Sequence, residues 1–149
     1  MEVKSLDGKG IDFLIELEGL RLKPYLDSVN IPTIGVGCTY YEDGKRVTIK
    51  DLPITKERAI SLFLNILGPY EKLVWSVTRD DLSQDQFTAL VCLAFNIGQT
   101  SFRNSTVLKK INAKKSIEEI RASWFAWKFA GGKPILLGRR KKEFEYFIS

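Results

Sequence analysis

Three polar residues near the N-terminus have types and a spacing that could carry out acid/base chemistry. Glu18 ends an apolar helical pattern, Asp27 follows after eight intervening residues, and Thr33 follows after five more. Glycosidases use such a pair of carboxyl groups, one to protonate the leaving oxygen and the other to manage a water molecule. The strand predicted around Thr33 would hold its hydroxyl group in place beside that pair.

The position of Glu18 on its helix is unusual for a charged residue. Ile11, Leu14, Ile15 and Glu18 are spaced i, i+3, i+4 and i+7, which places them on one face of a helix over residues 9–18. A carboxyl group on such an apolar stripe either finds a charge partner or keeps its proton. A protonated carboxyl group is what a general acid requires.

Simpler roles account for the same three residues. Glu18 could form a salt bridge with Arg21 or Arg139, Asp27 could be an ordinary turn residue, and Thr33 an ordinary strand residue. Isolated carboxylates are common, and physics alone does not single out this spacing. The pattern by itself therefore leaves both interpretations open.

The elements that must position these residues can be predicted from capping residues and periodicity. Gly19 is suited to end the first helix, and residues 21–47 have the turn residues and alternation of short strands, including Asn30 and Gly44 for positive φ. The rest of the chain is predicted to be mainly helical, over residues 55–67, from 69 onward, and over 84–97, 105–112, 116–127 and 138–147. Gly68-Pro69 is expected to break the chain between the first two of these helices, Ser83 to cap the third, and a capping box to begin the helix over 116–127.

Aromatic side chains near the C-terminus have two interpretations. Trp124, Phe125, Trp127 and Phe129 could form a platform for sugar rings, but their helical spacing favours a place in the core. The helix over 84–97 is apolar on most sides and is predicted to lie at the centre of the helical part.

Composition excludes several kinds of chemistry. The 149 residues have a net charge of +5 and include no histidine, which rules out histidine-based triads and histidine metal ligands. The two cysteines, Cys38 and Cys92, lack metal-site spacing and are expected to be reduced and at least partly buried. No cofactor is implied. The N-terminus does not look like a secretory signal, so we expect synthesis in a cytoplasm.

The stretch EGLRLKPYLDSVNIPTIGVG closely resembles the signature of the phage lysozymes, the endolysin muramidases of glycoside hydrolase family 24. The family pattern is Glu, eight residues, Asp, five residues, Thr and then Ile-Gly-x-Gly, and this chain matches it throughout. The similarity continues through QFTALVCLAFNIG, FRNSTVLKKIN, FAWKFAGGK and RRKKEFEYF, so it covers nearly the whole chain.

The resemblance implies a fold and an activity. The fold would be α+β and mainly α, a lysozyme-like two-lobe fold in one catalytic domain over residues 1–149. A small β-containing lobe at about 20–52 and a helical lobe at about 1–19 and 53–149 would enclose a cleft. The activity would be hydrolysis of the β-1,4 bond between N-acetylmuramic acid and N-acetylglucosamine in peptidoglycan, for lysis of the bacterial cell wall.

The resemblance also assigns roles to the three polar residues. Glu18 would be the general acid, Asp27 the carboxylate that positions or activates water, and Thr33 a residue that helps to hold that water. The family is taken to invert the anomeric configuration, which fits carboxyl groups separated by about 6.5 to 9.5 Å.

The resemblance also implies residues that contact the substrate. Tyr25 matches the family, and Phe95-Asn96 lies where the family has an aromatic-amide pair that lines the cleft. Asn96 could instead be an internally satisfied amide at a helix end. Arg139 and Arg140 match an arginine pair of the family, and Arg139 could orient Glu18, although both could also belong to a solvated basic face.

The chain departs from the family pattern in three places. Cys38 stands where histidine is common, Asn30 stands where glycine is common, and the Gly-Leu pair before the arginines is replaced by Ile135-Leu136. The first change removes a charged partner from a nearby acid, and the last leaves the register of the arginines open. All three departures fall at positions other than the three candidate catalytic residues.

The expected partner is bacterial peptidoglycan. Nucleic acid is not expected, because RRKK at 139–142 is a single short cluster, and stable membrane insertion is not expected either. The protein is expected to be a monomer, made in the host cytoplasm and released to the wall through a lesion made by a separate holin. The alternative function is an inactive lysozyme-fold domain that binds the wall or acts as a scaffold.

Overall fold

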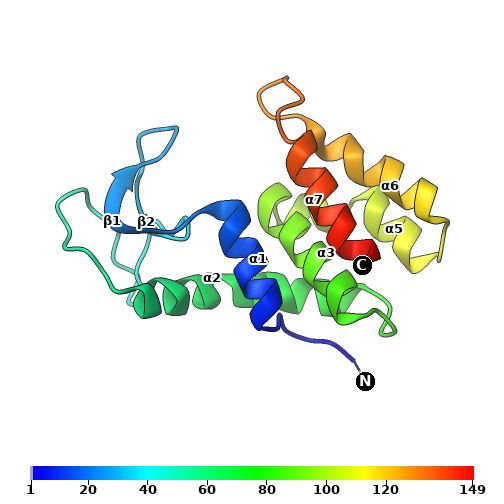
Figure 1. The fold of residues 1–149 in the computed structure, drawn as a ribbon, viewed down its shortest axis with the longest axis horizontal. Coiled ribbons are helices and arrows are strands. Elements are labelled where there is room, and N and C mark those ends of the chain that lie inside the picture. Colours follow the sequence, from blue (N-terminus) through cyan, green and yellow to red (C-terminus); the bar gives the residue numbers. More distant parts are fainter. Residues whose placement is uncertain (1) are drawn as a thin grey trace. The chain divides into compact units, whose positions relative to one another are not determined.

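The computed structural model describes residues 2–149, which form mainly helices with one small sheet (Figure 1). In chain order the elements are α1 (Gly8–Glu18), β1 (Arg21–Leu26), β2 (Pro32–Gly35), α2 (Lys56–Val77), α3 (Gln84–Ile97), α4 (Gln99–Arg103), α5 (Thr106–Asn112), α6 (Ile117–Phe125), the 3₁₀ helix η1 (Ala126–Lys128) and α7 (Leu137–Ile148). The predicted class, α+β and mainly α, is confirmed. The short helix α4 is not anticipated by the sequence patterns.

The chain divides into two compact units. The first, called here the helical unit, comprises the N-terminal segment up to Gly10 together with Pro69–Ser149. The second, called the hairpin unit, is Ile11–Gly68. The interpretation of residues 1–149 as one catalytic domain with two lobes stays a prediction.

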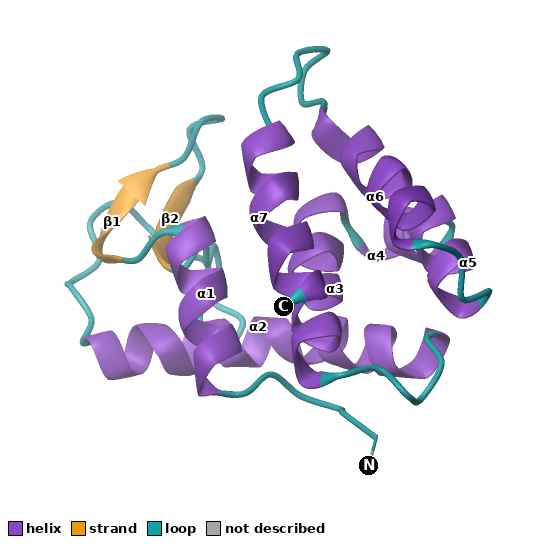
Figure 2. Ribbon diagram, turned by 45° about the vertical axis from the view of Figure 1, so that its right-hand side comes forward, coloured by secondary structure: helices purple, strands orange, loops and turns teal. Residues whose placement is uncertain are grey.

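The hairpin unit is built on two antiparallel strands, β1 and β2 (Figure 2). Tyr25 pairs with Thr33 and Leu26 with Pro32, and the turn between the strands contains Asn30 at φ +64°. Asparagine tolerates the left-handed region because its short polar side chain can bond locally. The expected use of Asn30 for positive φ is confirmed.

The helical unit is centred on α3. Eight consecutive residues of α3, from Phe87 to Ala94, are buried, and α7 lies beside this helix in both ribbon views (Figures 1 and 2). A helix buried on all sides must be covered by others, as its composition predicts. The central place expected for the helix over 84–97 is confirmed.

The predicted capping residues mark the helix starts, but the capping box expected at Ser116 is present only as its serine half. Ser83 and Gln86 form a reciprocal capping box at α3. The hydroxyl groups of Ser105 and Ser116 accept the backbone N–H of Leu108 and Glu119 at 3.1 and 3.2 Å. Each bond satisfies one of the N–H groups that a helix start leaves without a partner.

The helix α2 contradicts the predicted break at Gly68-Pro69. It runs without interruption from Lys56 to Val77 with Pro69 inside it, although proline removes one helical hydrogen bond. The buried side chains repeat at helical spacing on both sides of the proline, namely Ala59, Leu62, Phe63, Leu67, Leu73 and Val74. Burial of one continuous apolar stripe outweighs the local preference for a break.

The aromatic cluster near the C-terminus is only partly in the core. Trp124 is fully buried, and its ring centroid lies 5.6 Å from that of Phe144 and 5.3 Å from that of Phe147. Phe125 and Trp127 are half-buried. Phe129 is 56% exposed, so the core prediction is wrong for this residue, which follows the end of η1.

Both cysteines are buried thiols outside any disulfide, as expected. Burial raises the pKa of the Cys38 thiol, which donates to the Val36 carbonyl at 3.8 Å. Cys38 therefore behaves as a small core residue in place of the histidine common in the family.

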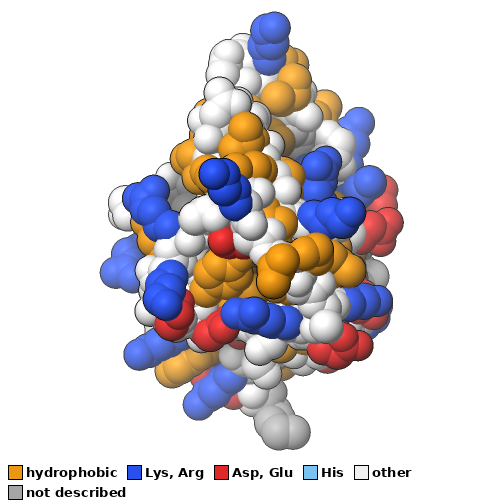
Figure 3. Space-filling view, turned by 90° about the vertical axis from the view of Figure 1, so that its left-hand side faces the viewer, with side chains coloured by type: hydrophobic (Ala, Val, Ile, Leu, Met, Phe, Trp, Pro, Cys, Tyr) orange, Lys and Arg blue, Asp and Glu red, His pale blue; other side chains and the backbone are white. Residues whose placement is uncertain are grey.

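Figure 3 shows one face of the molecule, on which hydrophobic side chains are exposed between charged ones. Acidic side chains lie beside basic ones over the lower part of this face. The exposed hydrophobic residues of the hairpin unit include Leu22, Leu26 and Leu52.

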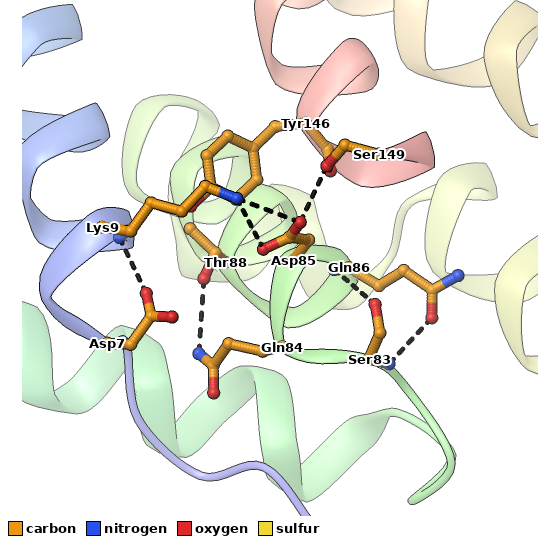
Figure 4. Close-up of polar contacts among 10 residues, drawn as sticks. Asp7, Lys9, Ser83, Gln84, Asp85, Gln86, Thr88, Tyr146 and Ser149 are labelled. Atoms are coloured by element: carbon orange, nitrogen blue, oxygen red, sulfur yellow. Dashed lines mark hydrogen bonds and ion pairs between the residues drawn. The ribbon is translucent and has the colours of Figure 1, made fainter.

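A polar network ties the start of α1 and the C-terminus to the start of α3 (Figure 4). The Asp85 carboxylate lies 3.2 Å from Lys9 Nζ and accepts the Ser149 hydroxyl at 2.8 Å. The Asp7 carboxylate accepts the Gly10 N–H at 2.8 Å. These contacts bring two distant parts of the chain onto one helix terminus within the helical unit.

We expect Gly10→Ala to destabilise the protein, because Gly10 packs directly against Thr88. A Cβ atom at Gly10 would lie 2.8 Å from Thr88 Cγ2 and 2.9 Å from Thr88 Oγ1, and Thr88 is fully buried. Overpacking of this kind typically costs about 1 to 3 kcal/mol. The matched control is Gly8→Ala, because a Cβ there has nothing within 4 Å. Urea unfolding should place the free energy of unfolding of Gly10→Ala below that of the control, and equal values would contradict the packing argument.

Candidate active site

Glu18 is the last residue of α1. The helix ends because Gly19 adopts φ +85°, and the Gly19 N–H donates to the Ile15 carbonyl at 2.7 Å. Leu14 is fully buried on the predicted stripe, whereas Ile15 and Glu18 are half-buried. The helix thus places the Glu18 carboxyl group at the edge of the apolar stripe.

Asp27 is held by the turn that it begins. Its Oδ1 accepts the backbone N–H groups of Val29 and Ile31, both at 2.9 Å. The Asp27 N–H in turn donates to the Ile31 carbonyl at 3.0 Å. An aspartate that accepts N–H groups further along its own turn is a common way of building such a loop. One carboxylate oxygen is therefore used by the turn, while Oδ2 makes no hydrogen bond within the described residues.

Thr33 is bound to the same peptide segment as Asp27. Its side chain is buried, at 3% exposure, and Oγ1 donates to the Ile31 carbonyl at 2.8 Å. Because the hydroxyl hydrogen is engaged, Oγ1 has only acceptor capacity left for another group. Ile31 thus fixes both side chains through its backbone, by its N–H to Asp27 and by its carbonyl to Thr33.

Tyr25 lies next to this pair. It stands directly opposite Thr33 in the antiparallel sheet, so the two side chains share a face. Burial raises the pKa of the Tyr25 hydroxyl, the Arg21 guanidinium opposes that rise, and the negative charges of Asp27 and Glu18 add to it. The Arg21 guanidinium stacks 4.4 Å from the centroid of the Tyr25 ring. The hairpin unit therefore brings Glu18 and Asp27 within electrostatic reach of Tyr25, which stands opposite Thr33.

The two glycines of the Ile-Gly-x-Gly motif are explained by backbone geometry. Gly35 and Gly37 adopt φ +67° and +68°, a region that residues with a side chain rarely enter. A Cβ on Gly35 would also meet Ala59 of α2 at 3.5 Å. Glycine is therefore required at these two positions by the tight turn after β2, and at Gly35 also by its packing on α2.

The remaining predicted residues belong to the helical unit. Phe95 lies on α3 with its ring centroid 5.1 Å from that of Tyr70 in an edge-on arrangement. Asn96, the next residue, is half-buried, and its Oδ1 accepts a hydrogen bond from the Arg140 guanidinium. The role of both residues in binding substrate stays a prediction.

The two arginines are not a solvated basic face. Arg140 is fully buried and the Arg139 side chain is 12% exposed. Arg139 Nε donates to Glu143 Oε2 at 3.0 Å and its guanidinium donates to the Cys92 carbonyl at 3.2 Å. The interpretation as solvated residues is therefore wrong for both arginines.

Glu143 was not among the predicted site residues. It is fully buried, with Arg140 Nε 3.2 Å and the Trp124 indole N–H 3.1 Å from Oε1. Burial raises the pKa of Glu143, while both guanidinium groups and the indole N–H oppose that rise. The sequence does contain a signal for this cluster. Glu143 follows Arg139 by four residues and Arg140 by three, and residues at these spacings are neighbours on a helix surface.

No group of three or more Cys, Asp or Glu residues in the described part of the chain could hold a metal ion. The hairpin unit holds one carboxyl group at a helix end and a second in a turn beside a hydroxyl group, and a pair of carboxyl groups is what most glycosidases use.

Comparison with known proteins identifies the family. The phage lysozyme family model matches residues 15–143. The endolysin of Salmonella phage P22 is 41% identical over 146 residues, which cover 97% of this chain and 99% of that protein. A crystal structure of a P22 lysozyme mutant matches with a TM-score of 0.88 and 40% identity over 99% of this chain and 100% of that chain. The endolysin from Escherichia coli O157:H7 phage FAHEc1 matches with a TM-score of 0.89 and 30% identity over 100% of this chain and 97% of that chain. The chain therefore belongs to the phage lysozyme family.

Proposed function

We propose that this chain cleaves the β-1,4 bond between N-acetylmuramic acid and N-acetylglucosamine with inversion, using Glu18 as general acid and Asp27 with Thr33 to hold the attacking water. As a phage lysozyme, the protein is a peptidoglycan-hydrolysing muramidase that serves cell-wall lysis. The mechanism and the residue roles are the proposal.

The observation that carries this mechanism is the shared attachment of Asp27 and Thr33 to Ile31. A water molecule that donates one O–H to Asp27 Oδ2 and the other to Thr33 Oγ1 has both hydrogens engaged. Its lone pair is then directed away from the protein groups and attacks the anomeric carbon, while the bond to the leaving oxygen breaks and one proton of the water passes to the Asp27 carboxylate. The Ile31 carbonyl keeps the Thr33 hydroxyl in the acceptor role that this arrangement needs.

Glu18 is the remaining carboxyl group of the cluster and is assigned the proton transfer to the leaving oxygen. A positioned general acid typically contributes about 10²- to 10⁴-fold in rate. We assign substrate contacts to Tyr25 in the hairpin unit and to Phe95, Asn96 and Arg139 in the helical unit.

The substrate and cellular setting follow from the same proposal. Peptidoglycan is the partner, and the protein works as a monomer without nucleic acid. No helix in the described part of the chain is long and apolar enough to cross a membrane. We propose synthesis in the host cytoplasm and action on the wall after release through a lesion made by a separate holin.

An inactive wall-binding domain is the alternative. The presence of Glu18, Asp27 and Thr33 together favours the enzyme, because a domain that only binds the wall has no use for a general acid beside a water-holding pair. Release of reducing ends from purified peptidoglycan separates the two, since a binding domain would release none.

We expect the newly released reducing end to be the α-anomer. A water held by Asp27 and Thr33 attacks from the face opposite the leaving group, so the β-linkage gives an α-product. The measurement is the anomer ratio by proton NMR before mutarotation, with a retaining lysozyme run alongside as the opposite standard. A β-anomer from this protein would mean retention, and the water-holding roles would have to be abandoned.

A further inference from the structure

The side-chain amide of Asn96 is held in one orientation. Asn96 lies in the last turn of α3, and its Oδ1 accepts a hydrogen bond from the Arg140 guanidinium. A guanidinium has only donors, so the amide must turn its oxygen toward Arg140 and its nitrogen away. The orientation of an asparagine amide is normally assigned from its surroundings, and here a permanently charged donor settles it.

Arg140 belongs to a buried cluster of charged side chains. Its Nε lies 3.2 Å from Glu143 Oε1, which also accepts the Trp124 indole N–H at 3.1 Å. The other carboxylate oxygen accepts Arg139 Nε at 3.0 Å. Arg140 and Glu143 are fully buried, so neither side chain has room to turn. A planar guanidinium in such a cluster loses little further freedom when it bonds Asn96.

The contact with Arg140 uses the amide oxygen of Asn96 and leaves its amide nitrogen available to donate to another group. This nitrogen makes no hydrogen bond to the residues that the structure describes, and it is not a buried polar atom. Asn96 is half-buried beside Phe95, whose ring packs on Tyr70. The helical unit therefore presents an N–H₂ group of fixed direction next to an aromatic side chain.

We propose that Arg140 and Glu143 are positioning residues that make Asn96 a donor-only contact for an acetamido carbonyl oxygen of the glycan. The inference rests on the proposed function and names the chemical group that Asn96 recognises. Sugar hydroxyl groups donate and accept, so a freely turning amide would serve them equally well. A carbonyl oxygen only accepts, and a fixed donor suits it specifically. The fixed amide thus selects N-acetylated sugars.

The sharpest variant is Asn96→Asp. The carboxylate has the shape of the amide and can still bond Arg140, so we expect the fold to be kept, but the substrate would meet an acceptor instead of a donor. A site built to hydrogen-bond a group discriminates strongly when that bond cannot form. We expect KM on soluble N-acetylated glycan strands to rise about 10- to 100-fold with a much smaller change in kcat.

The same strands after chemical N-deacetylation test the identity of the acceptor. Deacetylation leaves an ammonium group that the new carboxylate of Asn96→Asp would attract, so the comparison rests on Arg140→Lys, which keeps the charge of the site. On the acetylated strands Arg140→Lys should raise KM, since a flexible ammonium cannot hold the amide as a planar fork does. For Arg140→Lys the ratio of variant to wild-type KM should fall to within about threefold on the deacetylated strands, because the carbonyl is absent from both reactions. A purely structural role would raise KM equally on both substrates.

Asn104→Asp is the matched control, because it adds the same charge at an exposed residue that ends α4. Its KM should stay near the wild-type value on both substrates. If Asn96→Asp proves unfolded by thermal melting, Asn96→Ser replaces it in the same comparison. An unchanged KM, or equal losses on both substrates, would overturn the inference. Absence of any reducing ends with the wild-type protein would instead refute the proposed function.

Discussion

Glu18→Gln should abolish wall hydrolysis while leaving the protein folded. The amide has nearly the shape of the acid but cannot deliver a proton to the leaving oxygen. Loss of a positioned general acid typically costs about 10²- to 10⁴-fold in rate. The measurement is release of reducing ends from purified peptidoglycan, with circular dichroism to establish that the variant is folded.

Glu16→Gln provides the control for this experiment. Glu16 lies two residues earlier on the same helix with an exposed side chain, so the substitution makes the same chemical change outside the carboxylate cluster. It should keep nearly full activity. A Glu18→Gln variant that retained a tenth or more of the wild-type rate would refute the assignment of Glu18 as the acid.

Glu143→Gln should cause the largest loss of stability. The fully buried Glu143 carboxylate faces both Arg139 and Arg140 and accepts the Trp124 indole N–H. Removing one partner of a buried ion pair leaves an uncompensated charge in the interior and typically costs about 3 to 5 kcal/mol. Urea unfolding should show this as a lower midpoint with an unchanged slope.

Glu145→Gln is the matched control on the same helix. Glu145 is exposed, and a surface substitution of this kind usually changes the free energy of unfolding by no more than about 0.5 kcal/mol. If Glu143→Gln unfolded within about 1 kcal/mol of this control, the buried cluster would contribute little to stability. Its part in holding Arg140 would then also be in question.

Much of the candidate site could be predicted because it depends on short-range chemistry. The spacing of Glu18, Asp27 and Thr33 is a local pattern, and Gly19 and Asn30 supply the positive φ values that the helix end and the turn require. The caps Ser83, Ser105 and Ser116 were predictable for the same reason. Each of these features is decided by a side chain and the few peptide groups next to it.

Other features depend on which distant side chains meet. The helix α2 continues through Pro69 although proline favours a break, because the apolar side chains on both sides of the proline are buried. No local pattern singles out Gly10, whose close contact with Thr88 is visible only in the fold. Local propensity is a weak prior, and burial of a continuous surface overrides it.

The sequence by itself determined the family pattern, the helix ends and the residue types able to carry out the hydrolysis. Only the tertiary structure decided that Arg140 is buried and Arg139 largely shielded from solvent, that Glu143 joins them, and that Asn96 turns its amide oxygen to Arg140. The physical reason is that a charged run such as RRKK has the same composition whether it faces water or a buried carboxylate. Desolvation and pairing are set by the packing of α3, α6 and α7, which no local pattern specifies.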